Sequence, residues 1–351
     1  MAYQNVGTPR FYVCSLQWAK SLGLLQVEQP FDTSHRNYQD PLDAVGINPT
    51  ELFQVQATDP YPNWHYNISS GEVPLLHADV GWVGLLGHSL GLEGNKFQIL
   101  DQSGEGSFSA FPLESINWSP DDGIYSKCDY DGFTLWTFSL NSVVFYLSTQ
   151  IYYYGNFDPY CNSICFGTYF DMPVSPNLSL SLSYEYDGVR KITTKGGADL
   201  SYNRYTKPAM WGDLSPWELD VGVSQTRHLG KSGRRSWDLK FSFMDDGDLW
   251  GPNQSLAEGA WTSITADQGW DSGDFSDQYN SFSKMLLNDN NFFSQVWHKT
   301  NSGVLPFVFQ PDNTNNKPDQ FCIARFKNNS LKATQSAFNV YDISLTIEEA
   351  W

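Results

Sequence analysis

The pentapeptide GHSLG at residues 87–91 carries the residue types of a serine nucleophile. It matches the G-x-S-x-G pattern, in which a sharp turn from a strand into a helix exposes the serine hydroxyl. The pattern follows the apolar residues 82–86, but Gly94 comes three residues later and interrupts the helix that the motif needs. A serine esterase that uses Ser89 is therefore a minor alternative to a glycine-rich strand end.

Paired carboxylates and metal-ligand spacings are the other candidates for chemistry. The acidic group at 245–248 is typical of a turn, because a chain with 39 acidic residues contains such groups unavoidably. Cys161 and Cys165 have no neighbouring histidine or second cysteine pair, so they do not form a zinc motif. The segment 129–132 (DYDG) lacks the later ligands of a calcium loop. We therefore expect no catalytic residue, no metal and no other cofactor.

Aromatic side chains form 16% of the chain, and several of them are grouped. Tyr152, Tyr153 and Tyr154 are consecutive, so at least one ring is expected to be exposed if they lie in a strand. Trp261 and Trp270 are the large apolar residues of a stretch rich in Gly, Ser and Asp. Such rings combine an apolar face with a polar edge and suit a glycan platform or a protein interface. The open alternative is the core of a β-sandwich.

The spacing of apolar residues predicts strands. Apolar and polar residues alternate over 178–186, 237–243 and 341–347, which indicates strands with one buried face. Shorter aromatic or β-branched runs are also typical of strands and occur at 133–140, 143–147, 151–154 and 305–309. Pairs such as Gly196-Gly197 lie between strand-like runs and predict antiparallel hairpins.

Helix is scarce. The best candidate is 291–300, where Asn291 can cap the start and Gly303 is placed to end it; a weaker candidate is 11–22. We therefore predict an all-β fold with two antiparallel β-sandwich or jelly-roll-like domains. These are an acidic domain over 1–186 and a domain over 187–351, which holds the single helix and a long arm at about 251–278.

The formal charge is −18 and is unevenly distributed. Residues 1–185 hold 5 basic and 19 acidic side chains, whereas 186–351 hold 16 and 20. An acidic surface repels phosphate, so nucleic acid is not expected as a partner. The basic residues of the second half form two clusters, at 190–207 and at 227–235, and the latter includes Arg234 and Arg235. They are predicted either to meet carboxylates across a subunit interface or to form a solvated face.

Membrane insertion is not expected either. No stretch approaches the ~20 apolar residues that cross a bilayer, and residues 1–10 lack the pattern of a secretion signal. The five cysteines are scattered and odd in number, which predicts free buried thiols in a protein that folds in a cytoplasm.

The order of elements in the C-terminal third resembles the tail-tip proteins of long-tailed bacteriophages, of the distal-tail and minor-tail type. A strand, a helix, two further strands and a closing acidic strand follow one another at 237–243, 292–298, 305–311, 320–325 and 341–351. Residues 8–13 and 167–178 also resemble virion proteins of aquatic phages. The resemblance covers about half of the chain and lies in pattern and order.

The resemblance implies a structural protein of the virion that is assembled in the bacterial cytoplasm. Its partners would be copies of itself in a ring and other tail or capsid proteins. The alternative is a receptor- or glycan-binding decoration or fibre protein, with Tyr152–Tyr154 as the platform for a host glycan. In either case the function lies in surfaces, so the resemblance transfers no catalytic residue to this chain.

Overall fold

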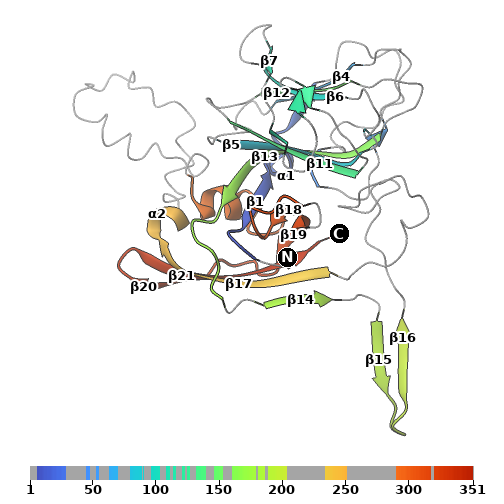
Figure 1. Ribbon diagram of the computed structural model, residues 1–351, viewed down its shortest axis with the longest axis vertical. Helices are drawn as coiled ribbons and strands as arrows, with labels where there is room; N and C mark the ends of the chain where they lie inside the picture. Colours follow the sequence, from blue (N-terminus) through green and yellow to red (C-terminus); the bar gives the residue numbers. More distant parts are fainter. Residues whose placement is uncertain are drawn as a thin grey trace.

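The computed structural model confirms the all-β prediction for the part of the chain that it describes. The strands form two antiparallel sheets and a separate hairpin (Figure 1). The described residues are 6–28, 45–47, 53–54, 63–69, 80–88, 90, 96–102, 108–110, 114–115, 121–122, 125–126, 132–139, 146–152, 160–178, 181–185, 189–203, 234–250, 290–317 and 320–350.

The larger sheet has twelve strands. Its main path runs through β14 (Ser181–Glu185), β17 (Arg234–Asp245), β21 (Val340–Glu349), β19 (Cys322–Phe326), β18 (Phe307–Gln310), β1 (Arg10–Cys14), β13 (Tyr160–Asp171), β5 (Val80–His88), β11 (Gly132–Ser139) and β8 (Glu114–Ser115). Two strands lie off this path: β20 (Ala333–Ala337) pairs with β21, and β3 (Phe53–Gln54) pairs with β13.

The smaller sheet has seven strands and lies beyond β5 and β13, on the side away from β17 and β21 (Figure 1). Its order is β2 (Gln26–Glu28), β4 (Asn63–Ser69), β12 (Tyr146–Tyr152), β6 (Lys96–Gln102), β10 (Tyr125–Ser126) and β9 (Asp121–Asp122), with β7 (Phe108–Ala110) paired to β6. Residues 81–88 of β5 are all buried, as expected of a strand covered on both faces. The arrangement is that of a β-sandwich.

The larger sheet crosses the predicted domain boundary at 186/187. β1 lies between β13 and β18, and β14 pairs with β17, so strands from both sides of the boundary are hydrogen-bonded neighbours. One core cluster likewise joins Phe11 and Phe170 to Trp237 and Phe309. The division into 1–186 and 187–351 stays a prediction, but neither the larger sheet nor this core is divided there.

β1 packs so closely on β13 that one position of β13 has to be glycine. At Gly167, a Cβ would lie 1.9 Å from the carbonyl oxygen of Val13. The same carbonyl accepts a 3.0 Å hydrogen bond from the indole Nε1 of Trp82. On the other side of β1, the buried Tyr12 hydroxyl donates to Gln310 Oε1 of β18 at 2.7 Å. β1 therefore links the two halves of the sheet.

The described helices are short and differ in part from those predicted. Over 11–22 a strand comes first, and α1 (Ser15–Ser21) begins only after it. The predicted helix at 291–300 is present as η2 (Phe293–His298), which is wound as a π-helix. Asn291 caps it as predicted, since its Oδ1 accepts from the Ser294 N–H at 2.8 Å. The C-terminal half holds a second helical turn, α2 (Asp246–Leu249), where the sequence predicts a turn.

Candidate functional site

The histidine of the GHSLG motif is a buried structural residue. His88 is the last residue of β5, and its Nδ1 accepts a 3.2 Å hydrogen bond from the Leu90 N–H. In the neutral ring the proton therefore lies on Nε2, which donates to Thr134 Oγ1 of β11 at 2.9 Å. Burial without a charged partner lowers the pKa of His88 to about 3. The imidazole is thus neutral at physiological pH and holds β5 to β11.

The chain around this motif runs from strand to strand. β5 ends at His88 and β6 begins at Lys96, so seven residues separate the two strands. A nucleophile elbow requires a strand, a tight turn and a substantial helix, for which this connection is too short. Ser89 itself lies outside the described residues. The esterase alternative therefore stays a prediction.

Most of the predicted aromatic platform lies outside the described residues. Tyr152 is the last residue of β12, and its side chain is not described. Tyr153 and Tyr154 follow it outside the described ranges, as do Trp261, Trp270 and the whole predicted arm at 251–278. The glycan platform and the arm therefore stay predictions.

Arg235, predicted as an interface residue, forms an ion pair within the chain. Its Nε and Nη2 donate to the two carboxylate oxygens of Glu349 at 3.2 and 3.1 Å, and its side chain and that of Glu349 are 12% and 11% exposed. A further bond of 2.9 Å reaches the Phe321 carbonyl, and the guanidinium lies over the Trp237 ring at 5.4 Å. Arg235 thus ties β17 to the end of β21.

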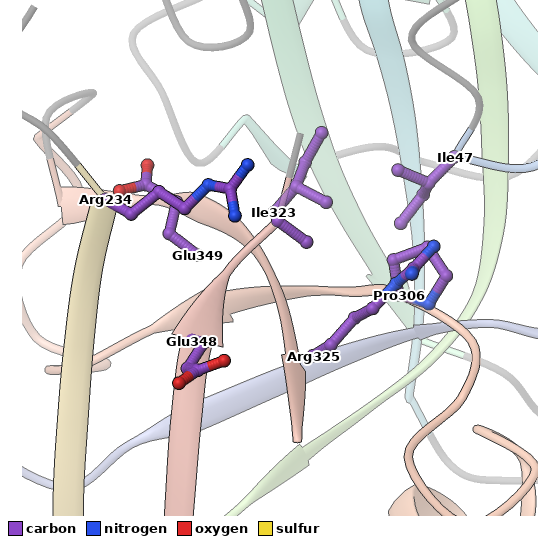
Figure 2. A pocket seen from close by; sticks show the side chains of 8 residues that line it. Ile47, Arg234, Pro306, Ile323, Arg325, Glu348 and Glu349 are labelled. Atoms are coloured by element: carbon purple, nitrogen blue, oxygen red, sulfur yellow. The ribbon is translucent and has the colours of Figure 1, made fainter. Parts of the chain in front are cut away.

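Arg234, the other predicted arginine, lines a pocket of about 230 Å³ beside this ion pair. Figure 2 shows Ile323 between Arg234 of β17 and Arg325 of β19. The wall also includes Glu349, which pairs with Arg235, and Glu348, which pairs with the Lys327 ammonium. The lining holds two arginines and two glutamates, and both glutamates are already paired with other cations, so the pocket carries no clear sign of its ligand.

A buried lysine was missed by the sequence analysis. Lys299 follows η2 and is 3% exposed, and its Nζ donates to Gln295 Oε1 at 2.8 Å. The same oxygen accepts from Thr168 Oγ1 of β13 at 3.1 Å. Burial lowers the pKa of Lys299 to about 7. With so little exposure the amine cannot meet a substrate, and its surroundings indicate a role in packing.

Exposed apolar side chains are the second feature that the sequence analysis missed. Phe243 and Phe338 are 79% and 88% exposed at one end of β17, β20 and β21, whereas Ile192 and Leu200 are 58% and 59% exposed on the separate hairpin. Single exposed apolar side chains are common, whereas apolar side chains that gather at one place mark interaction sites. Leu22, Leu178 and Val304 are also exposed, each on its own, so the two places where exposed apolar residues come in pairs are the candidate functional surfaces of the described part of the chain.

Comparisons with models of known protein families, with curated proteins and with solved structures found no match. In the described ranges, no helix has the length and apolar character needed to span a bilayer, and no three metal-ligating side chains gather at one place. Function is therefore argued from the two exposed surfaces.

Proposed function

We propose that this chain is a structural protein of a bacteriophage virion, a tail-tip or tail-adaptor subunit that assembles into a ring with copies of itself. The observation that carries the proposal is the exposure of Phe243, Phe338, Ile192 and Leu200. The order of strands and helix in the C-terminal third, which resembles the distal-tail type, supports it from the sequence.

The position of these residues favours a contact surface. Phe338 lies in a two-residue turn between β20 and β21, and Ile192 and Leu200 lie opposite each other in a two-stranded hairpin. The core has no shortage of large apolar groups, since Trp82, Trp136 and Trp237 are all fully buried. Aromatic and aliphatic groups at the centre of an interface supply most of its binding energy. Exposed groups of this kind therefore suit a protein that binds copies of itself.

The mass of the purified full chain in solution tests the proposal. Size-exclusion chromatography with light scattering is expected to give a fixed multiple of the 39.7 kDa chain mass, and negative-stain images are expected to show closed rings. A mass of one chain at every concentration, together with no binding to other virion proteins, would refute it.

A further inference from the structure

A two-stranded hairpin stands away from both sheets (Figure 1). This basic hairpin comprises residues 189–203, with β15 (Val189–Thr193) paired to β16 (Asp199–Asn203). Its turn is well formed: the Gly197 N–H donates to the Thr194 carbonyl at 2.9 Å, and Gly197 has the positive φ of 81° that such a turn needs. The predicted Gly196-Gly197 turn is therefore confirmed.

The basic hairpin exposes both apolar and cationic groups. Ile192 lies directly opposite Leu200, and both are more than half exposed. A lone two-stranded ribbon is only marginally stable in water, so covering this pair would stabilise it. The hairpin contains Arg190, Lys191 and Lys195 against Asp199. It thus carries a formal +2, and the remaining residues carry −20, together the −18 of the chain.

A second surface has the same apolar character and the opposite charge. This acidic tip lies at the end of β17 and β21 and comprises Phe243, Asp245, Asp246, Asp248, Phe338 and Asp342. Its parts are held together by hydrogen bonds from backbone N–H groups: that of Phe243 donates to the carboxylate Oδ1 of Asp342 at 3.1 Å, and that of Asp246 donates to the Asn339 carbonyl at 3.0 Å. The two exposed phenylalanines therefore lie beside four carboxylates.

The acidic tip has two unfavourable features, one in the backbone and one in its charges. Phe243 has a φ of 62°, in the left-handed region that a bulky residue rarely adopts and that costs about 1–3 kcal/mol. The pKa of Asp248 is raised, first by partial burial and then by the nearby charge of Asp245. A cation at the tip would relieve the repulsion between these carboxylates. An apolar contact would account for a phenylalanine at a position where glycine would be relaxed.

We propose that the basic hairpin of one copy docks on the acidic tip of a second copy. Ile192 and Leu200 would cover Phe243 and Phe338, and the hairpin cations would meet the tip carboxylates. The two surfaces lie on different sides of the molecule (Figure 1), so the contact joins different copies head to tail. Such a contact closes into a ring when its rotation permits. The inference rests on the proposed ring assembly and names the surfaces that build it.

Two variants of the full chain test this docking because each removes one surface. The hairpin variant carries Ile192→Asp and Leu200→Asp, and the tip variant carries Phe243→Asn and Phe338→Ser. All four side chains are exposed, so the fold is expected to persist, which unfolding curves and near-ultraviolet circular dichroism check. A control variant, Val304→Ser, changes an exposed apolar residue away from both surfaces.

Each variant alone is expected to have the mass of one chain, because it lacks one half of the contact. An equimolar mixture is expected to have twice that mass, since the tip of the hairpin variant still accepts the hairpin of the tip variant. The control is expected to assemble as the wild-type chain does. A hairpin or tip variant that keeps the wild-type mass, or a mixture that stays at one chain, would overturn the docking. A wild-type chain that never assembles would instead overturn the proposed function itself.

Discussion

The neutral, buried imidazole of His88 makes the stability of the fold depend on pH. A base whose pKa is lower in the folded chain than in the unfolded chain contributes stability that is lost as the pH falls. The ordinary pKa of histidine is 6.5, and in the folded chain it is about 3. The unfolded chain therefore binds a proton below pH 6.5 that the folded chain takes up only near pH 3.

The size of this effect follows from the difference in pKa. One pKa unit corresponds to 1.36 kcal/mol, so the stability due to His88 falls by about 2 kcal/mol between pH 7 and pH 5 and by about 4 kcal/mol between pH 7 and pH 3. His88→Gln removes the titration while keeping an amide that can donate to Thr134. At pH 7 the free energy of unfolding of this variant is expected to be lower than that of the wild type, but it is expected to fall less toward low pH.

Urea unfolding followed by tryptophan fluorescence at pH 7.0, 6.0 and 5.0 measures this difference. Groups other than His88 titrate in both proteins, so the difference between the two stability curves isolates its contribution. We expect the gap between wild type and variant to close by about 2 kcal/mol from pH 7 to pH 5. A gap that stays constant would show that His88 is solvated or charged in the folded chain and would refute the buried arrangement.

Three further changes test other parts of the fold. Gly167→Ala is expected to lower the free energy of unfolding by about 3 kcal/mol or more, because the new Cβ would meet the Val13 carbonyl. Gly196→Ala is the control: the nearest atom to its new Cβ is 3.9 Å away, so the free energy of unfolding is expected to change by less than about 0.5 kcal/mol. Chemical unfolding measures both. Phe243→Gly is expected to raise the free energy of unfolding by about 0.5–1 kcal/mol, because relief of the positive φ outweighs the entropy of glycine, and to weaken self-association. A more stable fold with unchanged self-association would contradict the docking role of Phe243. Between pH 7 and 8.5 the free energy of unfolding of the wild type is expected to rise by about 2 kcal/mol, because the pKa of Lys299 is lowered on folding. A Lys299→Met variant with the same rise would contradict this.

Strands with one buried face were predictable because their pattern is local. Alternating apolar residues over 237–243 and 341–347 became β17 and β21, which pair with Trp237 opposite Ile347 and Leu239 opposite Leu345. The apolar side chains of both strands face one core, except Phe243, which the bulge between Phe241 and Met244 leaves exposed. The Gly196-Gly197 turn was predictable for the same reason.

Elements that depend on distant partners were not predictable. The start of 11–22 has apolar residues at positions that suit a helix as well as a strand. It forms β1 because it pairs with β13, more than 150 residues away, and with β18, about 300 residues away. Residues 11–14 are buried on both faces, so they show no alternation. The π-wound geometry of η2 likewise has no signal in the local sequence.

The candidate surfaces were predictable only in part. The cluster of basic residues that includes Lys191 and Lys195 is visible in the sequence, and the structure places both on an exposed hairpin. Arg235 belongs to the other cluster, but a carboxylate 114 residues away engages it within the chain. The exposure of Phe243 and Phe338 follows from a bulge and a turn, which composition does not reveal.

Cross-linking between two copies tests the central claim most directly. One chain carries Leu200→Cys and the other carries Phe338→Cys, and the two are mixed under mild oxidation. We expect a disulfide-linked pair that contains one chain of each variant. No disulfide-linked pair is expected from either variant alone or from the wild-type chain. A mixture that yields no linked pair, although the wild-type chain assembles, would contradict the contact between hairpin and tip.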